Sequence, residues 1–120
     1  MPEYLTNFLK ETSRALKEFN KTPIDVHSVV LCYKGTPWAL TWSQFEVLAE
    51  DVFYNKSFGN TVVNSTLKIV GLDWWLERMD YDGEEWWKYQ EHPLATDVWI
   101  KAEETKPEWL YTEFVKKTHF

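Results

Sequence analysis

Cysteine, glycine and long apolar runs are scarce in this chain of 120 residues. The single cysteine, Cys32, excludes an intramolecular disulfide, which fits a reducing compartment. The four glycines form no Gly-rich phosphate turn, so a doubly wound dinucleotide-binding fold is disfavoured. No apolar run approaches the roughly 18 residues of a membrane span, and the N-terminus lacks the basic start and apolar centre of a signal peptide. We therefore expect a soluble, cytoplasmic protein without a membrane partner.

Sequence patterns for catalysis or metal binding are also missing. The three histidines lie on separate segments, and no HxH, HExxH or CxxC spacing indicates a metal site. No serine stands in a GxSxG context, and one cysteine with distant histidines does not make a nucleophile signature. Carboxylates are abundant near the predicted hairpin tip, but acid–base catalysis needs a carboxyl group that is buried and has a raised pKa. We expect the carboxylates of a hairpin tip to be exposed to solvent. We therefore expect no enzymatic activity, no cofactor and no metal.

Aromatic residues, by contrast, make up 18% of the chain and include eight tryptophans. With 44% hydrophobic residues, the composition predicts a single globular domain over residues 1–120 that buries a substantial core. The net charge is −6, and six carboxylates lie between Asp73 and Glu85 with Arg78 as the only base among them. A basic patch is missing, so direct nucleic-acid binding is not expected. The acidity favours a partner with a basic surface; the alternative is an acidic surface that only keeps the protein soluble.

The segment from Trp74 to Trp87, WWLERMDYDGEEWW, predicts a β-hairpin. Asp82 and Gly83 stand between two runs rich in aromatic residues, and both central positions of a type I′ turn need a positive φ angle. With these two residues as the loop, the register of the strands follows. It places these residues opposite each other: Tyr81 and Glu84, Asp80 and Glu85, Met79 and Trp86, Arg78 and Trp87, Glu77 and Lys88, and Leu76 and Tyr89.

Three of these cross-strand pairs are favourable: Glu77 with Lys88, Arg78 with Trp87, and Met79 with Trp86. Arg78 opposite Trp87, for example, permits a cation–π contact worth up to about 1 kcal/mol. Asp80 opposite Glu85 is the unfavourable pair, because like charges that face each other destabilise a sheet. Such a pair indicates an exposed tip, a shifted register or a site that binds a cation. We favour the exposed tip.

Each tryptophan doublet is expected to place one indole on either face of the sheet, because successive strand residues point in opposite directions. An exposed indole beside carboxylates is a candidate contact for a partner, whereas burial of all eight tryptophans in the core is the alternative. The candidate binding residues are therefore Trp74, Trp75, Asp80, Tyr81, Asp82, Glu84, Glu85, Trp86 and Trp87.

The sequence as a whole predicts an α+β fold. The order of elements favours an antiparallel sheet of about five strands, a hairpin plus a three-stranded meander, with about three helices packed mainly on one face. In the first half of the chain the predicted elements are a helix over 3–19, a strand over 24–33, a turn at 34–37, a strand over 38–42, and a helix from Ser43, capped with Glu46, to about Phe53. They are followed by a loop over 54–64 that passes into a strand, a strand over 67–70, hairpin strands over 74–81 and 84–90, and a strand or extended connection over 97–102. The last predicted element is a helix capped by Thr105, with Leu110, Tyr111, Phe114 and Val115 buried.

The segment from Val70 to Pro93 resembles a motif of the form WWLERxxYDGxEWW, followed by proline, in small uncharacterised proteins of phages and prophages of Gram-positive bacteria. The resemblance covers about a fifth of the chain. It implies an accessory protein in the cytoplasm of a bacterial host. Phage accessory proteins of this size are often inhibitors of host enzymes or of antiviral defence.

Two hypotheses of function follow. The first is a protein-interaction module, a monomer or homodimer, that inhibits a host or antiviral-defence protein by placing its acidic, aromatic hairpin on a basic surface of that protein. The second is a small-ligand or carbohydrate binder that uses exposed tryptophan side chains as stacking surfaces.

Overall fold

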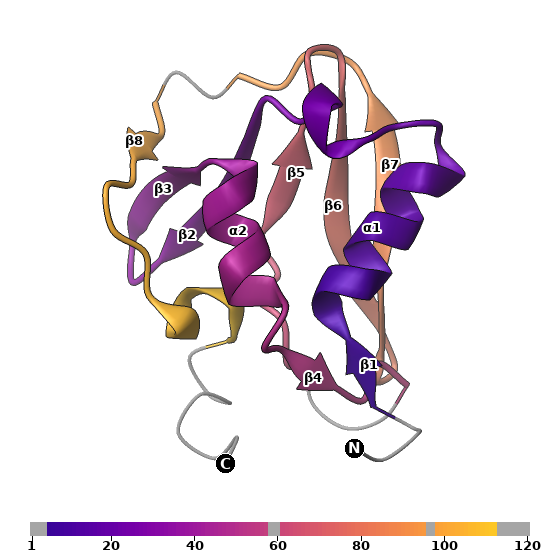
Figure 1. The fold of residues 1–120 in the computed structure, drawn as a ribbon. Coiled ribbons are helices and arrows are strands. Elements are labelled where there is room, and N and C mark those ends of the chain that lie inside the picture. Colours follow the sequence, from indigo (N-terminus) through magenta and orange to yellow (C-terminus); the bar gives the residue numbers. More distant parts are fainter. Residues whose placement is uncertain (1–4, 58–60, 96–97, 113–120) are drawn as a thin grey trace.

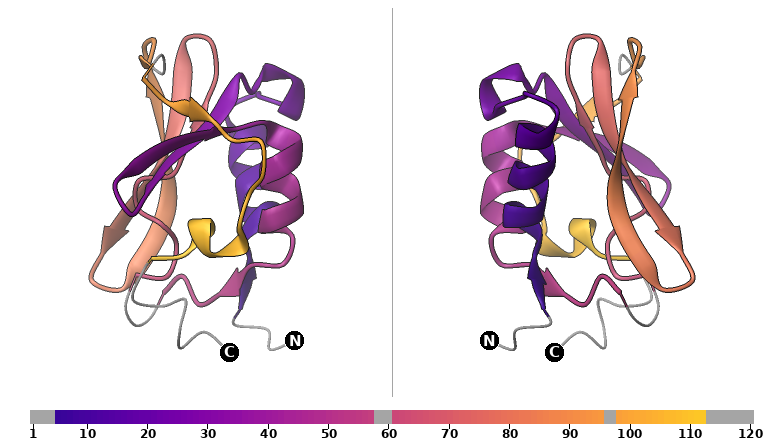
Figure 2. Two further views of the ribbon diagram at one scale, coloured as in Figure 1. Left: turned by 90° about the vertical axis from the view of Figure 1, so that its left-hand side faces the viewer. Right: turned by 90° about the vertical axis from the view of Figure 1, so that its right-hand side faces the viewer.

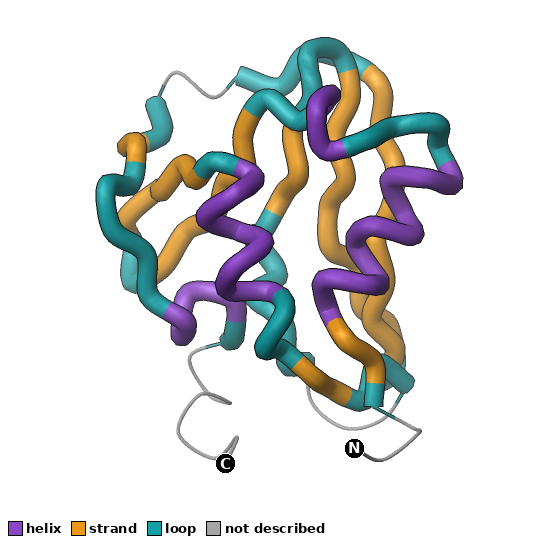
Figure 3. Tube along the Cα trace, viewed as in Figure 1, coloured by secondary structure: helices purple, strands orange, loops and turns teal. Residues whose placement is uncertain are grey.

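The computed structural model describes residues 5–57, 61–95 and 98–112. A six-stranded sheet is covered on one face by two α-helices, α1 (Phe8–Glu18) and α2 (Trp42–Ala49), as Figures 1 and 2 show. Figure 3 shows the same layering with the helices in purple in front of the strands in orange. The strands, in spatial order, are β7 (Glu84–Glu91), β6 (Trp74–Tyr81), β5 (Lys68–Val70), β2 (Ser28–Tyr33), β3 (Thr36–Leu40) and β8 (Ile100–Lys101).

All neighbouring strands of this sheet run antiparallel except β3 and β8, which run parallel. Outside it, β1 (Thr6–Asn7) pairs with β4 (Phe53–Tyr54), and η1 (Pro23–Asp25) and η2 (Pro107–Leu110) are short 3-10 helices. The predicted α+β class with a mostly antiparallel sheet is confirmed. The described residues contain six strands in the main sheet and two α-helices, where about five strands and three helices were predicted. No helix among them is long and apolar enough to cross a membrane.

The predicted hairpin forms in its predicted register along the whole length of β6 and β7. Asp82 and Gly83 have φ angles of 50° and 89°, as the two central positions of a type I′ turn require. The β2–β3 hairpin turns in the same way at Lys34 and Gly35, whose φ angles are 50° and 80°. This turn is shorter than predicted, so Thr36 already belongs to β3.

Helix α1 begins later than the sequence pattern predicts. Asn7 is its N-cap, and the side-chain oxygen of Asn7 accepts a hydrogen bond of 3.0 Å from the Lys10 N–H. The residues before it are extended because β1 pairs with β4. The predicted helix was therefore wrong over residues 5–7, and residues 3 and 4 lie outside the described part of the chain.

Helix α2 has a different N-cap from the predicted one. Thr41 and Gln44 form a capping box: Thr41 Oγ1 accepts from the Gln44 N–H at 3.1 Å, and Gln44 Oε1 accepts from the Thr41 N–H at 2.9 Å. The predicted pair, Ser43 and Glu46, has the same spacing but lies inside the helix. The helix ends before Phe53, which belongs to β4.

The structure also differs from the predictions before β2 and at η2. The strand predicted over 24–33 begins only at Ser28, because Pro23–Asp25 forms η1. Within the described residues, the last predicted helix is only the short η2. Lys106, and not Thr105, is its N-cap, and no side-chain hydrogen bond caps it. The rest of that predicted helix, with Phe114 and Val115, lies outside the described residues.

The core lies between the helices and the face of the sheet that they cover, which we call the inner face. Phe8 of α1 is fully buried at its centre. Its ring stacks on Trp87, with ring centroids 5.6 Å apart, and meets Phe45 and Tyr54 edge to face at 5.8 and 6.1 Å. Aromatic packing therefore joins α1, α2, β4 and β7 in one cluster.

Gly71→Ala is expected to destabilise the protein by about 1–3 kcal/mol, which is the usual cost of overpacking a core. A Cβ atom at this position would lie 2.0 Å from atoms of the Trp74 indole, which is itself buried. Urea unfolding of the parent and the variant measures the difference. In a Trp74→Leu background the clash is relieved, so the same substitution is expected to cost less; an equal cost in both backgrounds would contradict this packing.

Candidate functional site

The candidate binding residues of the hairpin are divided between the two faces of the sheet. Trp74 and Trp87 lie on the inner face, are 3% and 9% exposed, and belong to the core. Trp75 is half-buried on the outer face, where Trp86 is 38% exposed. The prediction that each doublet places one indole on either face is confirmed. The two inner indoles are therefore not available to a partner.

Arg78 also lies on the inner face, and its guanidinium is buried among aromatic rings. The ring centres of Trp87, Phe8 and Tyr54 lie 4.7, 5.1 and 5.9 Å from its central carbon. The cation–π contact predicted with Trp87 is present as one part of this arrangement. Rings alone cannot replace the water that a cation loses on burial, so polar partners are needed.

Glu11 and Tyr54 supply two of these polar partners. Nη1 of Arg78 lies 3.3 Å from Oε2 of Glu11, and Nη2 donates to the Tyr54 hydroxyl at 2.9 Å. The Tyr54 hydroxyl donates in turn to the other oxygen of Glu11. Burial raises the pKa of Tyr54 although Arg78 opposes the rise, so the hydroxyl keeps the proton that it donates. These bonds connect α1, β4 and β6.

Glu85 is the third polar partner. Its carboxylate accepts hydrogen bonds from the N–H groups of Val62 and Val63 at 2.9 and 3.1 Å, and lies 3.8 Å from Nη2 of Arg78. Burial raises the pKa of Glu85, and the two N–H groups and Arg78 offset that rise only in part. We call the following four residues the Arg78 cluster: Glu11, Tyr54, Arg78 and Glu85.

The expectation that Asp80 and Glu85 face each other at an exposed tip was wrong for Glu85, which is 4% exposed. The carboxylate of Asp80 is exposed but accepts a hydrogen bond of 2.6 Å from the Thr61 hydroxyl. The register is the predicted one, so a shifted register is not the explanation either. A positive group does lie beside the pair, as the third alternative proposed, but it is the protein's own Arg78.

A buried carboxylate with a raised pKa is a possible acid–base catalyst, and the expectation of wet carboxylates did not hold for Glu85. Its surroundings, however, leave little room for a substrate. The cavity beside it has a volume of about 10 Å³, roughly what one water molecule needs. We therefore assign Glu85 a structural role. Among the described residues, no group of three or more histidine, cysteine, aspartate or glutamate side chains is arranged to hold a metal ion.

Beyond the Arg78 cluster, the end of the hairpin is exposed. Tyr81 is 77% exposed, and its neighbouring carboxylates face solvent. Lys56 lies beside this end, because its carbonyl oxygen accepts a hydrogen bond of 2.7 Å from the Glu85 N–H. We call the following exposed residues the hairpin tip: Asp80, Tyr81, Asp82, Glu84 and Trp86.

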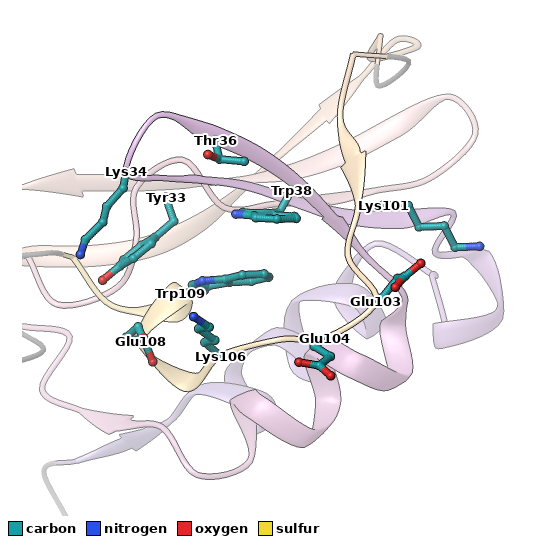
Figure 4. Close-up of a pocket in the computed structure, with 10 residues that line it drawn as sticks. All are labelled: Tyr33, Lys34, Thr36, Trp38, Lys101, Glu103, Glu104, Lys106, Glu108 and Trp109. Atoms are coloured by element: carbon teal, nitrogen blue, oxygen red, sulfur yellow. The ribbon is translucent and has the colours of Figure 1, made fainter.

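A pocket lies near the opposite edge of the sheet, and none of the predicted binding residues contributes to it. It has a volume of about 610 Å³ and lies between the β2–β3 hairpin, the segment that follows β8, and η2 (Figure 4). The indoles of Trp38 and Trp109 stack in it with ring centroids 4.8 Å apart. We call it the Trp38–Trp109 pocket; its other lining residues are Tyr33, Lys34, Thr36, Lys101, Glu103, Glu104, Lys106 and Glu108.

Contacts between distant segments build this pocket, which explains why the sequence did not predict it. The parallel pairing of β8 with β3 brings Ile100 and Lys101 to this edge. Gln44 Nε2 donates to the Ala102 carbonyl at 3.0 Å and holds the segment after β8 against α2. Asn64 Nδ2 donates to the Trp109 carbonyl at 2.9 Å and fixes η2. In the sequence, Trp38 and Trp109 are single tryptophans far apart in the chain, and no sequence pattern predicts that their indoles stack.

No protein-family model, curated protein or solved structure is significantly similar to this chain. The hairpin tip and the Trp38–Trp109 pocket are therefore interpreted from their own geometry. Together with the fold, they define an α+β protein with an exposed acidic hairpin and an aromatic pocket.

Arg78→Met is expected to destabilise the protein by about 3–5 kcal/mol, because it leaves two buried carboxylates without their cation. Urea unfolding measures the effect. Lys88→Met is the matched control, since Lys88 is an exposed cation on the same hairpin, and it is expected to change stability by less than about 0.5 kcal/mol. Equal stability of the two variants would show that the Arg78 cluster does not form.

The raised pKa of Glu85 predicts how stability depends on pH. A carboxyl group that holds its proton more tightly when folded stabilises the folded state below its ordinary pKa of 4.5, and this contribution is lost as pH rises through the raised pKa. Glu85→Gln removes this titration. Unfolding free energies measured from about pH 4 to about pH 8 are expected to show the parent losing stability relative to Glu85→Gln as pH rises. A constant difference would mean that the pKa of Glu85 is unshifted.

Proposed function

We propose that this protein is a protein-interaction module that binds a basic surface of a partner through the hairpin tip. The proposal depends on the difference in burial between the two ends of the hairpin formed by β6 and β7. Its base is buried in the core, whereas three carboxylates and two large aromatic side chains remain exposed at its end. Exposed aromatic groups surrounded by charge are the composition that interface centres favour.

The carboxylates of the tip supply long-range attraction. Asp80, Asp82 and Glu84 lie within five consecutive positions of the chain. In the described part of the chain, the basic residue Lys56 lies beside them. A concentrated negative patch accelerates encounter with a positive surface and adds to specificity more than to affinity. The mechanism that follows is mimicry of the charge of DNA toward a nucleic-acid-binding surface.

Tyr81 and Trp86 supply the short-range contacts. Both combine a large apolar ring with a polar group, which suits residues that lose water on binding. The Arg78 cluster anchors the strands that carry them, so the tip is presented with little conformational freedom to lose. Such preorganisation lowers the entropic cost of association.

The resemblance of the hairpin motif to phage and prophage proteins gives the proposal its most concrete form. In that form the protein is a phage-encoded accessory protein that acts in the host cytoplasm, and its partner is a host enzyme or an antiviral-defence protein. The alternative of a ligand binder that uses the hairpin tryptophans has less support, because Trp74 and Trp87 are in the core.

The test is affinity capture from lysate of a Gram-positive bacterium with three tagged versions of the full chain. The first is the parent. The second is a tip variant that keeps the positive-φ turn and the Thr61 hydrogen bond while removing charge: Asp80→Asn, Asp82→Asn and Glu84→Gln. The third removes the same charge from exposed positions at and after α2: Glu46→Gln, Glu50→Gln and Asp51→Asn.

We expect one partner to be retained by the parent and by the α2 control but to be lost, or bound at least about tenfold more weakly, by the tip variant. Its affinity for the parent is expected to fall as salt concentration rises. Identical protein lists for all three versions would contradict the proposal. Urea unfolding confirms beforehand that the tip variant is folded.

A further inference from the structure

We propose that the Trp38–Trp109 pocket is a second binding site, independent of the hairpin tip, and that its ligand is a neutral carbohydrate. The hairpin lies at one edge of the sheet and β8 at the other, so the two sites share no residue. The volume of about 610 Å³ is within the range of about 300–1,000 Å³ that small-molecule sites occupy.

The wall of the pocket is aromatic. The stacked indoles of Trp38 and Trp109 and the ring of Tyr33 come from β3, η2 and β2, and Figure 4 shows them side by side. Trp109 is almost fully buried and Trp38 is half-buried, so the pair is fixed in place by the core. Aromatic rings in this setting give an apolar surface for the C–H groups of a sugar ring.

The wall also carries two hydrogen-bond donors, the indole N–H groups of Trp38 and Trp109. In Figure 4 the nitrogen-bearing ends of both indoles lie toward Tyr33 and Lys34. No hydrogen bond from either indole N–H to another residue is found in the described part of the chain, whereas the buried indole of Trp87 donates to Thr12 at 2.9 Å. An indole N–H is a donor without acceptor capacity, so a ligand that meets it must offer a hydrogen-bond acceptor, such as a hydroxyl oxygen.

The charged residues of the pocket select the charge of the ligand. Three lysines and three glutamates line it, so its formal charge is zero. An anionic ligand such as a nucleotide would meet three carboxylates, and a cation would meet three ammonium groups. Hydroxyl groups, by contrast, donate to carboxylates and accept from ammonium groups and indoles.

The order of these charges argues against a zwitterion. Figure 4 shows Lys101, Glu103 and Glu104 toward one end of the pocket, with the Lys101 side chain extending away from the indoles, and Lys106, Glu108 and Lys34 toward the other end. Each end of the pocket therefore carries residues of both charge signs, and neither end is purely positive or purely negative. A ligand with many uncharged polar groups and apolar C–H faces fits this pattern better than an amino acid does.

The experiment is a titration of the ¹⁵N-labelled full chain, read by the indole N–H signals of its tryptophans in two-dimensional NMR spectra. The probes are maltotriose, cellotriose and chitotriose, with AMP and glycine as representatives of the anionic and zwitterionic classes. We expect at least one saccharide to shift the signals of Trp38 and Trp109 saturably. The signal of Trp86, the exposed indole of the hairpin tip, is expected to stay unchanged.

Variants separate this site from the rest of the protein. Trp38→Leu is expected to weaken saccharide binding about tenfold or more, and the matched Trp86→Leu is expected to leave it unchanged. Glu104→Gln changes one exposed side chain of the pocket and is expected to weaken binding about threefold to tenfold. If Trp38→Leu does not fold, the effect of Glu104→Gln shows whether the saccharide binds in the Trp38–Trp109 pocket.

Three outcomes would overturn the inference. They are the absence of a shift at Trp38 with every saccharide, a saturable shift with AMP or glycine but with no saccharide, and unchanged saccharide affinity in both pocket variants. The tip variant described under the proposed function is expected to bind saccharide like the parent. Failure of the hairpin proposal and failure of this one are therefore distinguishable.

Discussion

The guanidinium of Arg78 is buried where three aromatic rings and two carboxylates meet, and much of the structure is arranged around it. A buried cation must be paired and hydrogen-bonded, so its partners have to be delivered together. Glu11 comes from α1, Tyr54 from β4 and Glu85 from β7, and Glu85 in turn binds the backbone at Val62 and Val63. One charge thereby joins a helix, both sheets and a loop.

This arrangement divides the acidic hairpin into two parts with different roles. Glu85 is buried and bonded within the protein, whereas the carboxylates of the hairpin tip are exposed to solvent. The high density of carboxylates in the sequence therefore overstates the acidic surface that a partner can reach. The Trp38–Trp109 pocket lies near the far edge of the sheet, where β8 and η2 return to β3. The hairpin tip and the pocket share no residue.

The sequence predicted the features that depend on residues close together in the chain, such as the hairpin turn and its register. The Asp82-Gly83 turn sets the register of β6 and β7, and the register sets which indole of each doublet is buried. Features that depend on distant partners could not be predicted in this way. The burial of Glu85 needs the backbone of Val62 and Val63, and helix α1 begins late because β4 pairs with the residues before it. The pocket likewise needs a parallel strand pair that no turn specifies.

The contacts of Arg78 are expected to join α1 and the hairpin in one cooperative unit. Native-state amide hydrogen exchange under increasing denaturant tests this most directly. We predict that amides of α1 around Leu16 and amides of β6 and β7 around Arg78 and Trp87 open together, with the free energy of global unfolding, while amides at the Asp82-Gly83 turn exchange much earlier. Opening of α1 at a clearly lower free energy than the hairpin would contradict the account.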